Sequence, residues 1–190
     1  MTTKLQLAVV ATGVLSLAVI FAPTLAHAQN SVDLPSPFHF SGSGITLSNA
    51  PGLSPTTQVR ITAWIKPDFT ESNFVDTVVE KRDGCGSNRS YDFGVYKAQS
   101  GQPIGTIFFS SSMAGDDTYS NVPVPNDGRF HFIGGQYDGS TMKIFLDGAL
   151  VGQKPHSGPV AATSDPPVVG TDQCGHPAFA DIGVIQITSR

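Results

Sequence analysis

The sequence predicts an all-β domain folded as an antiparallel sandwich, on the evidence of its periodicity and its turns. Apolar and polar residues alternate in several short runs, whereas no segment longer than a few residues has the 3.6-residue period of an amphipathic helix. Asp-Gly pairs separate these runs, and Asp-Gly tolerates the positive φ that tight hairpin turns need. Many short strands with a turn roughly every eight to twelve residues are typical of a sandwich.

Residues 1–28 are predicted to be a secretory signal peptide and not part of the fold. Met1 to Lys4 is a short positively charged start, Leu5 to Leu25 is uncharged and mostly apolar, and Ala26-His27-Ala28 is a small-x-small cleavage site. The alternative is a permanent membrane anchor, because the apolar run is just long enough to span a bilayer. The site directly after the run favours cleavage. This leaves residues 29–190 as a single secreted domain without a membrane segment.

Composition argues against nucleic-acid binding. The chain has 11 Lys and Arg against 15 Asp and Glu, for a formal net charge of −4. Removing Lys4 with the signal peptide leaves 10 basic residues against 15 acids, a net charge of −5. With no basic patch and no run of like charge, the sequence lacks the features that bind phosphates.

Export decides how the two cysteines are interpreted. Cys85 and Cys174 reach an oxidising compartment, where a pair is most simply a disulfide. Free thiols or half of a metal site are the alternatives, but neither cysteine has the close Cys or His partners that zinc requires, and His176 alone is a poor candidate. The bond would close a loop of nearly ninety residues, which in the chain-entropy model stabilises the fold by about 4 kcal/mol.

The expected strands follow from the alternation. In the run 59–65 the apolar residues Val59, Ile61, Ala63 and Ile65 share one face, and in 142–146 Met142, Ile144 and Leu146 do the same. The Asp-Gly pairs at 138–139 and 147–148 predict a three-strand meander over 129–137, 141–146 and 149–153. Further β-rich runs contain Phe93, Val95, Ile104, Ile107 and Phe109.

Several of these segments resemble one known family. Residues 129–139, Arg-Phe-His-Phe-Ile-Gly-Gly-Gln-Tyr-Asp-Gly, are similar to the pattern W-H-H-V-A-G-T-Y-D-G of concanavalin A-like lectin/glucanase domains of the laminin-G type. Residues 142–148 resemble that family's L-x-L-Y-V-D-G, and 61–67 its V-S-A-W-V-K-P. Weaker likenesses at 37–47, 78–81 and 91–95 extend the resemblance over residues 37–188 in the same order.

The resemblance implies a jelly-roll sandwich of two antiparallel sheets, and motifs that are mostly architectural. We therefore expect Trp64 to pack in the core and not to stack on a sugar. We expect His131 to occupy a strand position and not to act as a catalytic base.

The acids do not predict an enzyme. Glycoside hydrolases share this sandwich and need two carboxylates about 5 to 10 Å apart. On a strand such a pair is expected at i and i+2 or i+4, and the chain has no Glu-x-Asp-x-x-Glu arrangement. Glu71 and Glu80 are its only glutamates, and most of its acids lie in predicted turns. We expect a protein without catalytic residues.

Calcium is the one cofactor that the resemblance raises. Many domains of this family hold an ion with an acid near the first strand and another in the last, and calcium takes six to eight oxygens. This chain departs at both places: residues 40–45 contain no acid, and Gly183 and Val184 replace the expected acid pair. The remaining candidate ligands are Asp172 and Asp181.

The polar segment 110–119 is the candidate ligand site. Asp116, Asp117 and Tyr119 combine an aromatic ring that can stack on a sugar with acids that can accept its hydroxyl hydrogens. The alternative is an ordinary exposed loop. We expect a secreted, non-catalytic binding module for carbohydrate, or for another extracellular ligand such as a protein. A glycoside-active enzyme on the same fold, and a structural or self-associating envelope protein, are the alternatives. The oligomeric state stays open.

Overall fold

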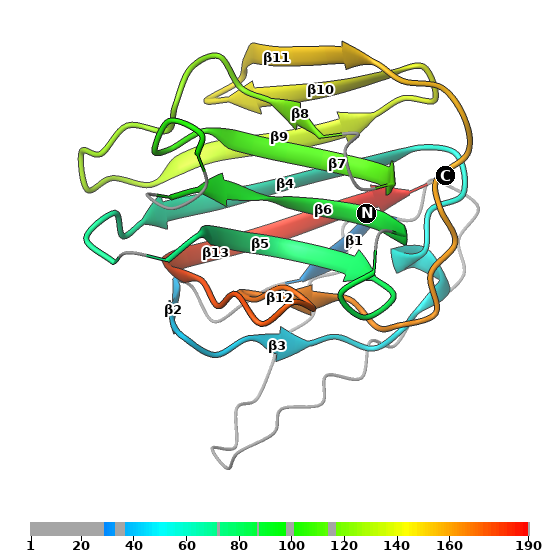
Figure 1. Cartoon of the computed structure of the whole chain (residues 1–190), viewed down its shortest axis with the longest axis horizontal. Coiled ribbons are helices and arrows are strands. Elements are labelled where there is room, and N and C mark those ends of the chain that lie inside the picture. The colour runs from blue at the N-terminus through cyan, green and yellow to red at the C-terminus, as the bar shows by residue number, and fades with distance from the viewer. Residues whose placement is uncertain are drawn as a thin grey trace.

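The computed structural model describes residues 29–32, 37–71, 73–86, 88–97, 101–113 and 117–189. The predicted signal peptide and Asp116 lie outside these residues. The described chain forms thirteen strands and one short 3-10 helix, η1 (Pro51–Leu53). The strands build two antiparallel sheets that lie face to face (Figure 1). This is the jelly-roll sandwich that the sequence predicts.

The first sheet has seven strands and contains the described chain's first and last strands. Its order is β1-β13-β4-β9-β10-β11, and β2 also pairs with β13. The bounds are β1 Gln29–Val32, β2 Phe38–Ser41, β4 Val59–Pro67, β9 His131–Tyr137, β10 Thr141–Leu146, β11 Ala149–Pro155 and β13 Phe179–Ser189.

The second sheet has six strands in the order β3-β12-β5-β6-β7-β8. Consecutive strands β5 to β8 are neighbours in it, just as β9 to β11 form the predicted meander in the seven-stranded sheet. The bounds are β3 Ile45–Thr46, β5 Val75–Arg82, β6 Asn88–Tyr96, β7 Ile107–Met113, β8 Thr118–Tyr119 and β12 Val168–Val169.

The core lies between the sheets and follows the predicted alternation. The apolar sets of β4 and β10 are buried, as predicted, and the six-stranded sheet contributes a row formed by Val79, Phe93 and Phe109. Burial of apolar surface at about 25 cal/mol per Å² is the main favourable term for such a core. Inward residues therefore alternate with residues that face outward on both sheets, and the outward residues are available for function.

Two glycines in the meander meet different requirements, one in a hairpin turn and one between the two sheets. At the β10–β11 turn Asp147 and Gly148 both have positive φ, 49° and 86°, as the tight two-residue hairpin requires. On β9 a Cβ at Gly135 would lie 2.5 Å from the Phe109 ring of the facing sheet. Only a residue without a side chain fits between the layers at that point.

Trp64 corrects the expectation that it packs in the core. Its side chain is 47% exposed on the outward face of the seven-stranded sheet. The alternation of β4 explains this, because Ala63 and Ile65 point into the core and the residue between them points away. The Trp64 ring lies beside Phe132 of β9, with 5.4 Å between ring centroids.

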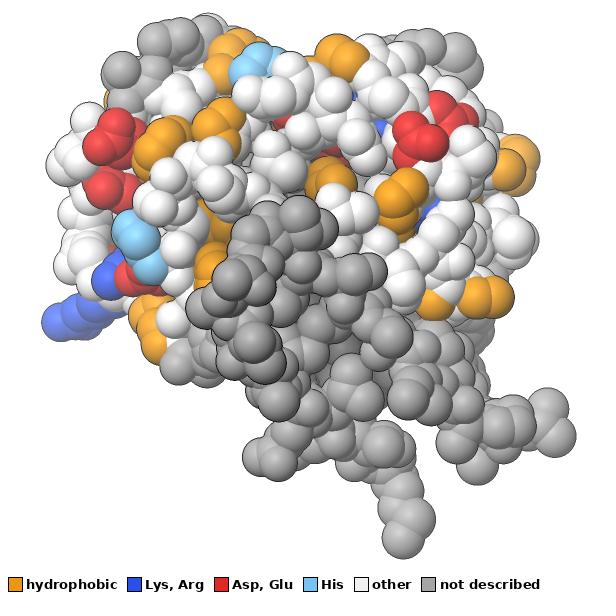
Figure 2. Space-filling view, turned by 90° about the horizontal axis from the view of Figure 1, so that it is seen from below, with side chains coloured by type: hydrophobic (Ala, Val, Ile, Leu, Met, Phe, Trp, Pro, Cys, Tyr) orange, Lys and Arg blue, Asp and Glu red, His pale blue; other side chains and the backbone are white. Residues whose placement is uncertain are grey.

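Around the edge of the sandwich, acidic, histidine and apolar side chains are interspersed on the surface that described residues form (Figure 2). The part of the chain that the structure describes contains no helix long and apolar enough to cross a membrane.

Candidate functional site

A cluster of charged side chains occupies the outward face of the six-stranded sheet. Because Val79 and Phe93 point into the core, their chain neighbours Glu80 and Asp92 point outward, opposite each other across β5 and β6. Ser110 of β7 continues this row, since it pairs with Asp92. All three residues are buried although they face away from the core.

Two arginines join the acids. The Arg82 Nε atom lies 2.9 Å from Glu80 Oε1, and its Nη2 lies 3.3 Å from Asp92 Oδ2. Arg89 Nη1 lies 2.9 Å from the same Asp92 oxygen and 3.4 Å from Asp117 Oδ1. We call Glu80, Arg82, Arg89, Asp92 and Asp117 the charged cluster. Burial makes these ion pairs interdependent, because removing one partner leaves the other charge uncompensated.

Burial also alters how the two central acids titrate. It raises the pKa of Asp92 well above its ordinary value, and the neighbouring Glu80 carboxylate adds to the rise, whereas Arg89 and Arg82 oppose it. Burial raises the pKa of Glu80 as well, against the hydrogen bond from the Gln173 backbone and the charge of Arg82. The two carboxyl groups therefore hold a proton more readily than exposed acids do.

The loop between β12 and β13 covers one side of the charged cluster. A disulfide joins Cys174 of this loop to Cys85 of the β5–β6 turn, as predicted. The Gln173 backbone N–H donates to Glu80 Oε2 at 2.6 Å, and Arg82 Nη1 donates to Cys174 Sγ at 2.9 Å. The disulfide thus holds the loop against the sheet at the point where Glu80 lies.

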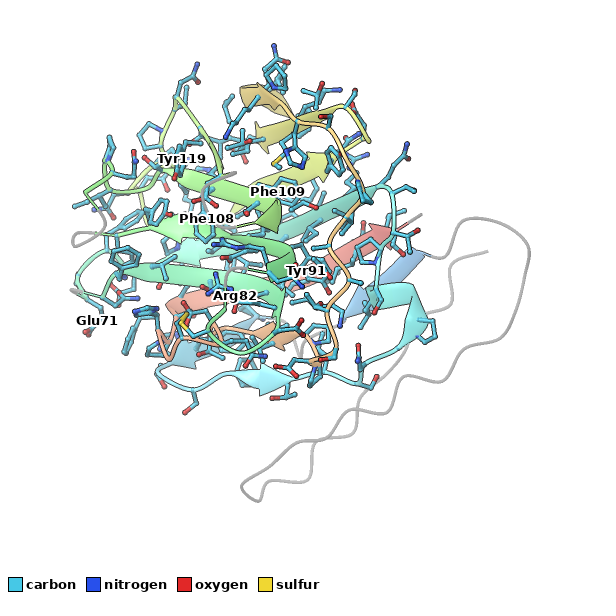
Figure 3. All side chains as sticks on the ribbon, turned by 45° about the vertical axis from the view of Figure 1, so that its right-hand side comes forward. Glu71, Arg82, Tyr91, Phe108, Phe109 and Tyr119 are labelled. Atoms are coloured by element: carbon cyan, nitrogen blue, oxygen red, sulfur yellow. A yellow bond between two sulfur atoms is a disulfide. The ribbon has the colours of Figure 1, made fainter. Side chains whose placement is uncertain are left out.

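Aromatic side chains lie next to the charged cluster on the outward face of the six-stranded sheet. The Tyr96 ring centroid lies 4.7 Å from that of Phe108, 5.9 Å from that of Tyr119 and 5.8 Å from that of Phe74. We call these four residues the aromatic strip. Figure 3 shows Tyr119 and Phe108 on the β8 side of the sheet and Arg82 on the β5 side. Tyr119 and Phe74 are 39% and 38% exposed, so the strip reaches the surface.

Comparison with known proteins identifies the architecture. Residues 40–186 match the family model described as the concanavalin A-like lectin/glucanases superfamily. The chain belongs to this superfamily. No curated protein sequence matches the chain.

Solved structures with the concanavalin A-like fold are similar at low identity. Domain 4 of the extracellular arabinanase AbnA from Geobacillus stearothermophilus, in complex with arabinotriose, is 14% identical with a TM-score of 0.61, over 86% of this chain and 76% of that one. The CBM40 of the Ruminococcus gnavus IT-sialidase, bound to α2,3-sialyllactose, is 16% identical with a TM-score of 0.61, over 83% and 90%. Domains LG4-5 of the mouse laminin α1 chain are 18% identical with a TM-score of 0.51, over 85% and 40%. At these identities the likeness concerns the fold.

The structure describes two of the three predicted ligand residues of segment 110–119. Asp117 and Tyr119 lie together, since the Tyr119 hydroxyl donates to Asp117 Oδ2 at 3.1 Å. Asp117 belongs to the charged cluster and Tyr119 to the aromatic strip, so the pair joins the two. Asp116 lies outside the described residues.

The structure gives the two candidate calcium ligands separate partners. Asp172 accepts hydrogen bonds from the backbone N–H of Cys174 and from the Nδ1 atom and backbone of His176. Asp181 lies on β13 and pairs with His39 and Lys66. In the described ranges no three His, Cys, Asp or Glu side chains are placed to hold a metal ion. The calcium site stays a prediction.

His131 lies at the start of β9, as expected, and away from the charged cluster. Its Nδ1 lies 2.8 Å from Asp147 Oδ2 and its Nε2 lies 3.1 Å from Asp127 Oδ1. Both acids belong to Asp-Gly turns, so the histidine joins two turns at one end of the sheet.

Sequence reasoning missed most residues of the charged cluster and the aromatic strip, including the central acids Glu80 and Asp92. A search for two acids on one strand cannot find them, because they come from different strands and meet only through the β5–β6 register. A signal was present in the alternation: in 78–82 and 91–95 these acids interrupt runs that are otherwise strand-like. An acid within a strand-like run, rather than in a turn, marks a position that needs a partner.

Proposed function

We propose that the chain is a secreted, non-catalytic carbohydrate-binding domain that holds a glycan across the outward face of the six-stranded sheet. The observation that carries this proposal is the aromatic strip beside the charged cluster. Exposed Tyr119 and Phe74 supply ring faces for stacking on sugar rings. Asp117 and Arg89 supply an acceptor and donors for sugar hydroxyls beside Tyr119. Sites of this kind combine mostly apolar walls with a few placed polar groups.

The charges of this face favour a neutral glycan. Arg82 and Arg89 are engaged by Glu80, Asp92 and Asp117. No cation of the cluster is therefore left to attract an acidic ligand, and a hydroxyl-rich sugar fits the paired donors and acceptors better. The carbohydrate-bound structures among the similar folds support the ligand class. The disulfide supports export, because such bonds persist in oxidising compartments.

A glycan array probed with residues 29–190 tests the proposal. We expect saturable binding to at least one neutral oligosaccharide, and a roughly tenfold or greater loss for Tyr119→Ala, since central aromatic residues carry much of the energy of an interface. Leu150→Ala is the matched control, because Leu150 is an exposed apolar residue on β11 of the other sheet. Binding to no oligosaccharide, or equal binding by both variants, would contradict the proposal.

One observation favours a second candidate, a glycoside-active enzyme. Glu80 and Asp92 are directly opposed across β5 and β6, which brings their Cβ atoms to about 4.5–5.5 Å. Retaining glycosidases use two neighbouring carboxyl groups. Against it, Glu80 is fully buried and both acids are held by arginines. Release of reducing ends from polysaccharides by the wild type, lost in Glu80→Gln, would favour this candidate.

A further inference from the structure

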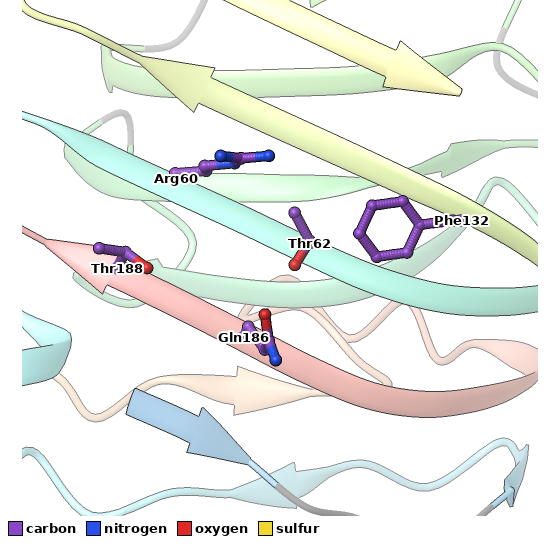
Figure 4. Close-up of a pocket in the computed structure, with 5 residues that line it drawn as sticks. All are labelled: Arg60, Thr62, Phe132, Gln186 and Thr188. Carbon is purple, nitrogen blue, oxygen red and sulfur yellow. The ribbon is translucent and has the colours of Figure 1, made fainter. Parts of the chain in front are cut away.

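The outward face of the seven-stranded sheet contains a second surface with the chemistry of a binding site. A hollow of about 150 Å³ lies there, lined by Arg60, Thr62, Phe132, Gln186 and Thr188 (Figure 4). These residues come from the adjacent strands β4, β9 and β13. The volume is below the roughly 300–1,000 Å³ of pockets that enclose a small molecule. This volume suits one unit of a longer polymeric ligand that lies across the sheet.

Register explains why these side chains converge. Thr62 of β4 pairs with Gly134 of β9 and with Gln186 of β13, so these three positions form one row across the sheet. The next row towards one end contains Arg60 and Thr188, and the next towards the other contains Trp64 and Phe132. The hollow therefore has the Phe132 ring on one side, with Trp64 next to that ring, polar groups in the middle and a guanidinium on the other side.

Because Gly134 has no side chain, the sheet surface beside the hollow stays open. Unlike Gly135, where a Cβ would collide with the core, Gly134 has room for a side chain: a Cβ there would meet Thr62 Cγ2 and Phe145 Cβ at 3.5 and 3.6 Å, ordinary contact distances. Its φ is also not positive. Neither packing nor backbone conformation requires glycine, yet any side chain at this position would rise between Phe132 and Gln136.

The aromatic side of the hollow is suited to a sugar ring. Trp64 is 47% exposed and Phe132 is half-buried beside it, with ring centroids 5.4 Å apart. Tryptophan offers a broad apolar face and an indole N–H donor at its edge. Such a pair can stack on a sugar while Thr62 and Thr188 meet its hydroxyls.

The charges of this face single out an acidic ligand. Lys66 pairs with Asp181, and Lys143 Nζ lies 2.7 Å from Asp138 Oδ2. Arg60 is exposed, and no described acid lies within ion-pair distance of it. A guanidinium fork matches a carboxylate in geometry as well as charge.

We propose that this hollow is a second glycan-binding surface, specific for a carboxylate-bearing sugar unit that stacks on Trp64 and Phe132 and pairs with Arg60. It is independent of the site on the six-stranded sheet, which lies on the opposite face of the sandwich and whose cations are already paired. The two surfaces would let one domain hold two chemically different polysaccharide chains.

The test uses residues 29–190 and a panel of oligogalacturonate, oligoglucuronate and oligomannuronate, each with its methyl-esterified form, in titration calorimetry at low salt. We expect at least one acidic oligosaccharide to bind at least tenfold more tightly than its neutral ester. Affinity should fall at least tenfold in Trp64→Ala and in Arg60→Met, and should weaken with added salt.

Gly134→Val is the discriminating variant. Valine is favoured in strands and there is room for its Cβ, so the variant should fold with an unchanged melting temperature. Its side chain would stand next to Thr62 at the edge of the hollow, and we expect at least a tenfold loss in affinity. Leu150→Ala and Tyr119→Ala should bind the acidic ligand as the wild type does. The proposal is overturned if no acidic oligosaccharide is preferred over its ester, or if Gly134→Val and Trp64→Ala bind normally. Because Tyr119→Ala reports on the other face, failure here leaves the neutral-glycan proposal to its own test.

Discussion

Glu80 on β5 and Asp92 on β6 lie directly opposite each other, and Arg82 reaches both, with Nε 2.9 Å from Glu80 Oε1 and Nη2 3.3 Å from Asp92 Oδ2. With Arg89 and Asp117 the charged cluster contains two cations and three acids. Its formal charge is balanced when one carboxyl group is protonated. Asp92, whose pKa burial raises well above its ordinary value, is the group that we expect to carry this proton.

This assignment predicts unequal costs for two substitutions in the charged cluster. With the proton on Asp92, as this assignment has it, Asp92→Asn exchanges one neutral group for another of the same shape, so we expect a loss of less than about 1.5 kcal/mol in unfolding free energy. Arg82→Met leaves Glu80 as a buried uncompensated charge, and we expect a loss of about 3–5 kcal/mol. Urea unfolding at pH 7 measures both. Equal losses would show that Asp92 is ionised.

The disulfide gives a second prediction. Cys85 and Cys174 are separated by 89 residues, so the double variant Cys85→Ser, Cys174→Ser should lose about 4 kcal/mol of stability in the chain-entropy model. Intact mass with alkylation checks the bond itself. Two added labels without prior reduction would contradict it.

Substitutions at the adjacent glycines Gly134 and Gly135 of β9 should differ in their effect on stability. Gly135→Ala would place a methyl group 2.5 Å from the Phe109 ring, and overpacking of this kind costs about 1–3 kcal/mol. Gly134→Ala meets only ordinary contacts, so we expect no loss. Thermal unfolding of the two variants checks this. A stable Gly135→Ala would mean that the sheets lie further apart than the structure has them.

His131 predicts a pH-dependent contribution to stability. Burial of the ring lowers its pKa, but the hydrogen bonds to Asp147 and Asp127 outweigh this and raise the pKa above its ordinary value. A raised histidine pKa stabilises the fold fully below the unfolded value of about 6.5, and the contribution is lost as pH rises through the folded value.

The variant His131→Gln should therefore cost more stability at pH 5.5 than at pH 9. Asp127 and Asp147 remain ionised at pH 5.5, since the hydrogen bonds they accept lower the pKa of both. Denaturant unfolding of wild type and variant at the two pH values gives the comparison. An equal cost at both would mean that the ring stays neutral in the folded protein.

The pattern of residues close together in the sequence was enough to predict the sandwich, because both the alternation and the Asp-Gly turns involve only residues that are near in sequence. The burial of Val59, Ile61, Ala63 and Ile65 follows directly from it. The same alternation places Trp64 on the outward face, and the expectation of a core position failed because it relied on a family motif instead.

The candidate site was harder to predict because it depends on register. Asp117 and Tyr119 were predicted as an aromatic residue near an acid, and the structure brings their side chains into contact. Glu80 and Asp92 are twelve positions apart in sequence and become neighbours only when β5 pairs with β6. Spacing along one strand carries no information about that pairing.

Amide chemical shifts measured during a titration with a neutral oligosaccharide selected on the array test the central claim most directly. If the outward face of the six-stranded sheet is the binding site, the largest shifts should fall on β6, β7 and β8, around Tyr96, Phe108 and Tyr119. Shifts confined to β4, β9 and β13, or no shifts at saturating sugar, would contradict the account.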